Sequence, residues 1–180
     1  MRTYLVTGGA GFIGSNYIHY MFRKYDNEIR IINVDALTYA GNLENLKDIE
    51  NRDNYTFIKA DITDKDAIMK IFEENDIDRV VHFAAESHVD RSIKNPEVFV
   101  KTNVLGTAVM LNCAKKAWEL PDGSFKTGKK FPGGKRYVTF YKDEDYPVYA
   151  KSGSIIPLAI LDEEDLNKLI FASIIIFISG

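Results

Sequence analysis

The feature of this sequence that most constrains its fold is a glycine-rich turn near the N-terminus. Gly8, Gly11 and Gly14 follow the β-prone residues 3–7 and lead into residues 12–25, which suit a helix. Glycines at such a junction let the backbone turn tightly and approach a pyrophosphate closely, while free N–H groups at the start of the helix point at the anion. The spacing therefore predicts the first strand–helix unit of a dinucleotide-binding fold. A glycine-rich turn that binds no ligand is the alternative.

An acidic residue ends the second predicted strand. Asp35 follows the apolar residues 29–34 and lies 21 residues after Gly14, close to the spacing of the acid that binds the adenosine ribose in such folds. A carboxylate here repels the 2′-phosphate of NADP, and no arginine follows at once to neutralise that phosphate. The sequence thus favours NAD over NADP. The alternative is that Asp35 merely caps the next turn.

Strands and helices alternate along the first two thirds of the chain. Residues 55–58 and 79–83 are β-prone, residues 64–75 show the apolar spacing of a helix, and a longer helix is expected from about residue 96 to 118, which Gly106 could interrupt. Strands that alternate with helices form a parallel sheet covered on both faces. We therefore expect an α/β fold with a Rossmann-like, doubly wound parallel sheet.

The segments that follow the third and fourth strands have the residues of a binding site. Asp61 and Ile62 close the third strand at the edge where ligands of such sheets bind, and are expected in the adenine pocket. After the fourth strand, Ser87 and His88 stand close to acidic residues, but they are consecutive on one segment, whereas a nucleophilic triad needs separate elements that converge. A hydrolase is therefore not expected. His82 lies in a buried strand and is expected to be a core residue with hydrogen-bond partners.

Composition and charge exclude several other classes of protein. The chain has 180 residues, 46% of them hydrophobic and 27% charged, which is ordinary for a soluble globular domain. A net charge of −3 argues against a nucleic-acid partner. The single cysteine, Cys113, excludes an internal disulfide and a cysteine-rich metal site, so we expect no metal and a cytoplasmic location. The apolar residues 169–178 are fewer than the ~20 that span a bilayer, so no membrane association is expected.

The character of the chain changes after Trp118. Glycines and prolines are frequent from residue 121 to 134, which indicates a loop or a boundary. We expect an NAD-binding Rossmann domain over residues 1–130 and a β-rich tail over residues 131–180. Residues 136–141 have strand character and could pair with the sheet.

Five segments of the first 131 residues resemble the dTDP-glucose 4,6-dehydratases of the extended short-chain dehydrogenase/reductase superfamily. They are TGGAGFIGSN at 7–16, VDALTYAGNLENL at 34–46, ADITD at 60–64, HFAAESHVDRSI at 82–93 and KTNVLGT at 101–107. The resemblance implies bound NAD, a dTDP-glucose substrate, and a reaction in which a hydride moves from C4 of the sugar to C6 while water is eliminated. It implies that Ser87 or His88 faces the sugar. It also implies an NAD site formed by Phe12, Ile13, Asp35, Ala36, Leu37, Thr38, Asp61, Ile62, Phe83, Ala84, Ala85, Glu86, Ser87 and Thr102.

The catalytic groups of this family are not found where the resemblance would place them. The family has a Ser-Thr-Asp-Glu-Val-Tyr-Gly segment after the fifth strand and then a Tyr-x-x-x-Lys helix, whose lysine lowers the pKa of the tyrosine. Here the tyrosine–lysine spacing occurs only at Tyr20 with Lys24 and at Tyr55 with Lys59, both interpreted as chance. We therefore assign no catalytic residue. We expect an inactive, truncated or chimeric chain, and the alternatives are an active enzyme whose tail supplies a base, a silent dinucleotide-binding module, and a fusion without an evolved role.

The last third of the chain suggests a second resemblance. Residues 127–135 and 147–158 are similar to the β-domain that follows the catalytic barrel of family 31 glycosidases. The likeness does not imply glycosidase activity, since the barrel with the catalytic carboxylates would be absent. The oligomeric state cannot be predicted from this sequence.

Overall fold

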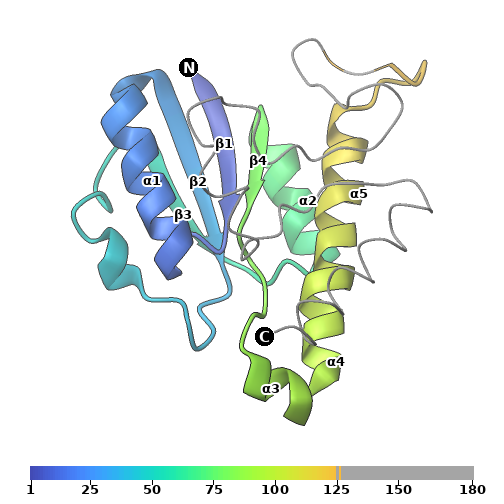
Figure 1. Ribbon diagram of the computed structural model, residues 1–180. Coiled ribbons are helices and arrows are strands. Elements are labelled where there is room, and N and C mark those ends of the chain that lie inside the picture. The colour runs from blue at the N-terminus through green and yellow to red at the C-terminus, as the bar shows by residue number, and fades with distance from the viewer. Residues whose placement is uncertain (125, 127–180) are drawn as a thin grey trace. The chain divides into compact units, whose positions relative to one another are not determined.

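The computed structural model describes residues 1–124 and 126, which lie in the first of two compact units, Met1–Lys129 and Lys130–Gly180. This part forms a four-stranded parallel sheet in the order β3-β2-β1-β4, in which strands alternate with helices (Figure 1). The predicted α/β fold with a Rossmann-like parallel sheet is thus confirmed. The predictions for residues 131–180, including the strand at 136–141 and the apolar stretch at 169–178, fall outside the described residues.

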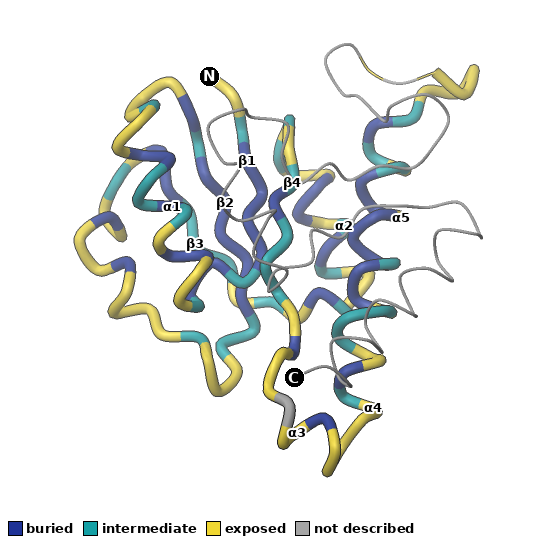
Figure 2. Tube along the Cα trace, in the orientation of Figure 1, coloured by how far each residue is buried: buried dark blue, intermediate teal, exposed yellow. Residues whose placement is uncertain are grey.

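The strands are close to the predicted ranges. They are β1 Arg2–Thr7, β2 Ile29–Asp35, β3 Tyr55–Lys59 and β4 Arg79–His82. The two central strands, β1 and β2, are buried along most of their length, as expected for a parallel sheet with both faces covered. Leu5, Val6, Ile31 and Ile32 are completely buried, and Figure 2 shows the centre of the sheet in the buried class.

The helices fill the connections between the strands. The α-helices are α1 Phe12–Tyr25, α2 Lys65–Glu74, α3 Val89–Lys94, α4 Pro96–Phe99 and α5 Thr107–Trp118; the 3-10 helices are η1 Asp26–Glu28 and η2 Leu43–Leu46; and η3 Val100–Gly106 is a π-helix. The long helix expected from residue 96 to 118 is therefore α4, η3 and α5 in succession. Its winding changes at Gly106, where a Cβ atom would lie only 2.5 Å from Ile62 Cδ1.

A second part of the core lies between α2 and α5, which pack together. Ile68, Ile71 and Phe72 of α2 are buried there. The rings of Phe72 and Trp118 meet edge to face, with centroids 6.1 Å apart, and the Trp118 indole N–H donates to the Ile77 carbonyl at 2.9 Å. Each buried side chain of this size contributes about 1.5–3 kcal/mol by leaving water, so this contact anchors α5 beside the sheet.

Residues 1–124 and 126 contain no helix that is both long and apolar enough to cross a membrane. The same residues include no group of three or more His, Cys, Asp or Glu side chains arranged to hold a metal ion.

Candidate functional site

The glycine turn between β1 and α1 leaves no space for side chains at two of its three predicted positions. Gly8 has a φ of +68°, and a Cβ atom there would lie 2.5 Å from the backbone nitrogen of Ala84. A Cβ atom on Gly14 would collide with the carbonyl oxygen of Gly8. Only glycine therefore allows β1 to run so close to the segment after β4, and allows α1 to begin so close to the turn.

Gly11 differs from these two glycines because the space around it is less crowded. A Cβ atom there would meet only the Gly8 carbonyl oxygen, at 3.3 Å. Gly11 is the N-cap of α1, whose first turn contains no acidic residue. Phe12 and Ile13 follow, 81% and 43% exposed. A helix start without acidic side chains, next to exposed apolar groups, suits an anionic ligand with aromatic parts.

Sequence reasoning missed the role of Gly9, because the predicted spacing passes over it. A Cβ atom on Gly9 would collide with the side-chain oxygen of Asn33, which is completely buried in β2. The Asn33 amide donates to the Tyr55 hydroxyl at 2.9 Å. The tyrosine of the Tyr55–Lys59 pair thus bonds a buried side chain of β2, in keeping with its interpretation as a chance match.

Asp35 joins the glycine turn to the turn after β2. Its carboxylate is 8% exposed and accepts hydrogen bonds from the backbone N–H groups of Ala10, at 3.0 Å, and Leu37, at 2.8 Å. The bond to Leu37 is the capping interaction that sequence analysis left as an alternative, and the bond to Ala10 shows that Asp35 also contacts the glycine turn. Leu37 has a φ of +53°, a left-handed conformation that costs about 1–2 kcal/mol for a residue with a side chain.

Two asparagines that sequence analysis did not select hold the same turn. The Asn42 backbone N–H and the Asn45 side-chain amide both donate to the Ala10 carbonyl, at 3.0 and 3.1 Å. The segment with Ala36, Leu37 and Thr38 is therefore fixed beside the glycine turn. No periodic pattern marks these asparagines.

The segment after β4 lies on the other side of the glycine turn. The Phe83 N–H donates to the Thr7 carbonyl at 2.9 Å, and the Ala84 N–H donates to the Thr7 hydroxyl at 3.3 Å. The ring of Phe83 packs against Tyr17 of α1, with centroids 5.2 Å apart. Ala85, further along, is exposed. Contacts thus bring Phe83 and Ala84 together with the glycine turn.

His82 is half-buried and has hydrogen-bond partners on both sides of its ring, as sequence analysis expected. Its Nδ1 lies 2.5 Å from the Thr7 hydroxyl and its Nε2 lies 3.1 Å from the Thr107 hydroxyl. Burial lowers the pKa of His82 to about 4, because desolvation disfavours the charged imidazolium. The ring is therefore neutral at pH 7.

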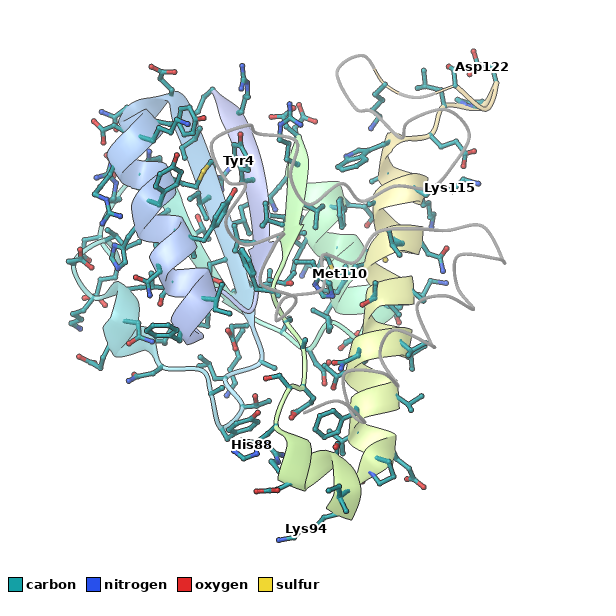
Figure 3. All side chains as sticks on the ribbon, viewed as in Figure 1. Tyr4, His88, Lys94, Met110, Lys115 and Asp122 are labelled. Carbon is teal, nitrogen blue, oxygen red and sulfur yellow. The ribbon has the colours of Figure 1, made fainter. Side chains whose placement is uncertain are left out.

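A second group of side chains connects the turn after β2 with α3. Glu86 is 8% exposed, and its Oε2 lies 3.5 Å from Arg91 Nη1 without forming a hydrogen bond. The Arg91 guanidinium lies 4.0 Å from the centroid of the Tyr39 ring, and His88 meets that ring edge to face. Figure 3 shows exposed His88 between α3 and the turn after β2. Tyr39 and Arg91 were not selected from the sequence, since no motif pairs residues so far apart.

Four further residues predicted for the site lie on other parts of the described structure. Asp61 is exposed, and its Oδ1 accepts two hydrogen bonds from Thr63, both at 2.9 Å. Ile62 is 4% exposed and packs against Gly106, so it belongs to the core. Thr102 is half-buried on η3, and Ser87 is exposed in the segment after β4.

Comparison with known proteins identifies one family. The family model for GDP-mannose 4,6 dehydratase matches residues 5–130. A dTDP-glucose 4,6-dehydratase from Escherichia coli is 43% identical over 157 residues, which cover 86% of this chain and 42% of the relative. A dTDP-glucose 4,6-dehydratase from Haemophilus influenzae is 47% identical over 131 residues, covering 73% of this chain and 38% of the relative. This chain spans less than half the length of these relatives.

Solved structures agree with this result. The dTDP-glucose 4,6-dehydratase of Bacillus anthracis, in complex with NAD, matches with a TM-score of 0.57 and 44% identity, over 64% of this chain and 34% of that one. The enzyme DesIV of Streptomyces venezuelae, a dTDP-glucose 4,6-dehydratase with NAD and TYD bound, matches with a TM-score of 0.59 and 37% identity, over 71% of this chain and 44% of that one.

The comparisons do not support the expected likeness of residues 127–158 to the β-domain of family 31 glycosidases. The family model reaches residue 130. The alignment with the Escherichia coli protein covers 86% of this chain, a share too large to fit within residues 1–131. A dehydratase relative therefore aligns with part of the segment on which the glycosidase likeness rested.

Proposed function

The chain belongs to the GDP-mannose 4,6 dehydratase family, and from that premise we propose that its first unit binds NAD as the cofactor-binding part of a dTDP-glucose 4,6-dehydratase. The proposal rests above all on Asp35, which is buried, accepts backbone hydrogen bonds, and lies beside a turn that excludes side chains. Relatives with NAD bound support it.

The residues of the site fit NAD. The start of α1 at Gly11, which has no side chain, suits the pyrophosphate. Asp35 would accept hydrogen bonds from the ribose hydroxyls, because a carboxylate has more acceptor positions than its two backbone bonds use. The remaining positions proposed for the cofactor site are Gly8, Phe12, Ile13, Gly14, Ala36, Leu37, Thr38, Asp61, Ile62, Phe83, Ala84, Ala85, Glu86, Ser87 and Thr102. When bound, NAD supplies the hydride acceptor of the reaction.

The proposal also covers the substrate and the catalytic activity of the chain. By family, the substrate is dTDP-glucose, and exposed Ser87 or His88 would face the sugar. The family's tyrosine–lysine pair is missing from its expected place in the sequence, so the chain binds the cofactor without completing the reaction. The alternative, an enzyme whose last 50 residues supply a base, predicts a 4-keto sugar product. A cytoplasmic location, expected from the single cysteine, is part of the same proposal.

Calorimetric titration of the purified chain tests cofactor binding. We expect NAD to bind with a micromolar or lower Kd and NADP to bind more weakly, because Asp35 repels a 2′-phosphate. Asp35→Ala and the isosteric Asp35→Asn should both weaken binding, whereas the exposed Asp53→Ala should not. Failure of the unaltered chain to bind either nucleotide would overturn the proposal.

Incubation with dTDP-glucose tests catalysis separately. The proposal predicts no increase in the absorbance that 4-keto sugars show in alkali. Formation of this product would overturn the silent interpretation and would leave the cofactor assignment intact.

A further inference from the structure

A chain of partly buried hydrogen bonds runs from the glycine turn through His82 to η3. The Thr7 hydroxyl is 2.5 Å from Nδ1 of His82, and Nε2 of the same ring is 3.1 Å from the Thr107 hydroxyl. Thr107 donates in turn to the carbonyl oxygen of Asn103, at 2.8 Å. Thr7 and Thr107 are buried, and His82 and Asn103 are half-buried.

The chemistry of the last acceptor fixes the direction of every bond in this chain. A carbonyl oxygen cannot donate, so the hydroxyl proton of Thr107 points at Asn103, and the Thr107 oxygen must accept from His82. The imidazole proton is then on Nε2. Because the ring is neutral, Nδ1 is an acceptor and receives the Thr7 hydroxyl proton.

The same series of hydrogen bonds continues from Asn103 to the segment after β4. The Asn103 side chain accepts from the Glu86 N–H at 2.8 Å and donates to the Glu86 carbonyl at 2.9 Å. Both backbone polar groups of Glu86 are therefore held by one side chain of η3. Thr7, at the other end of the chain, precedes Gly8 and contacts Ala84 through its hydroxyl oxygen.

We propose that His82 is a positioning residue which, as the neutral Nε2–H tautomer, sets the distance between the glycine turn and Glu86 and so shapes the cofactor site. A rigid imidazole places an acceptor and a donor on opposite sides of one ring, and the hydroxyls of Thr7 and Thr107 lie on those two sides. The expected effect on NAD binding rests on the proposed function. The assignment of the His82 tautomer does not depend on that function.

Nitrogen-15 spectroscopy of the histidine rings in the full 180-residue chain tests the tautomer without any ligand. We expect an unprotonated Nδ1 and a protonated Nε2 for His82. In Thr107→Val, which keeps the side-chain shape but removes the hydroxyl, the Glu86 amide should exchange with solvent faster. The matched control is Thr56→Val in β3, which should leave exchange at Glu86 unchanged. A protonated Nδ1, or unchanged exchange in Thr107→Val, would overturn the proposal.

NAD titration tests the consequence for the site. Thr107→Val should raise the Kd for NAD about tenfold, the effect of one lost buried hydrogen bond, with the far-UV spectrum unchanged. Thr56→Val should bind like the unaltered chain. Equal affinity in Thr107→Val would show that the hydrogen-bond chain has no role in the site. If the unaltered protein fails to bind NAD, the proposed function is wrong, and so is the role of His82 in a cofactor site. The ring spectrum and the amide exchange test the series of hydrogen bonds independently of that result.

Discussion

The two segments that flank the glycine turn are held in different ways. The turn after β2 is held mainly by local and backbone bonds: the Asp35 carboxylate binds two N–H groups, and the Asn42 N–H binds the Ala10 carbonyl. The segment after β4 depends on side chains from distant elements, chiefly Asn103, whose amide holds Glu86. A motif can therefore specify the first segment, whereas the second requires the whole unit to be folded.

The largest expected effect comes from adding a side chain at Gly8, where the glycine turn lies against the segment after β4. In Gly8→Ala the new Cβ atom would lie 2.5 Å from Ala84 N, in a residue with φ of +68°. The left-handed conformation and the collision together should lower the free energy of unfolding by about 4 kcal/mol, measured by urea denaturation. Gly11→Ala is the matched control, because its Cβ atom would meet one oxygen at 3.3 Å. Equal losses in the two variants would mean that the turn does not lie against the segment after β4.

Acid should lower the free energy of unfolding through His82, the last residue of β4. Its pKa is lowered from 6.5 to about 4, so between these values the unfolded chain binds a proton that the folded chain does not. The unfolded state therefore binds more protons in this range. The contribution of His82 to the free energy of unfolding is fully present above pH 6.5 and decreases as the pH falls to about 4. The total loss is about 3 kcal/mol, to be measured as urea midpoints at several pH values.

Substitution separates this histidine from the other groups that titrate in the same range. His82→Gln should reduce the slope of stability against pH, even if it lowers stability throughout. Thr56→Val, which removes no titratable group, should leave the slope as it is. A slope that His82→Gln does not change would contradict the assigned pKa.

The contrast also explains how much of the molecule could be predicted from the sequence. The glycine spacing and Asp35 are local signals, and β1, α1 and β2 agree with their predicted ranges to within one residue. Gly9 was missed because its constraint is the side chain of Asn33, 24 residues away. The Asn103–Glu86 and Arg91–Tyr39 contacts depend on how η3 and α3 pack, which periodicity does not encode. Ile62 is buried against Gly106, a contact with a residue 44 positions away that the local pattern does not reveal.

A moderate effect is expected when the side chain that holds the second segment is removed. Asn103→Leu leaves the N–H and carbonyl of Glu86 without their partner, at a cost of about 1–3 kcal/mol. Hydrogen exchange should become faster at Glu86 and its neighbours, while the amide of Leu37, bound to Asp35, keeps its protection. Faster exchange at both places would show that the two segments are not held independently.

The smallest effect concerns a side-chain contact between the turn after β2 and α3, in which the Arg91 guanidinium lies over the Tyr39 ring. Tyr39 is 54% exposed, and a cation–π contact at an exposed site contributes about 0.5–1 kcal/mol. Tyr39→Leu should lose this energy and Tyr39→Phe should keep it, because the attraction depends on the face of the ring. A double-mutant cycle with Arg91→Gln, measured by urea denaturation, isolates the contact. Additive losses in that cycle would mean that the contact between Arg91 and Tyr39 does not couple the turn after β2 to α3.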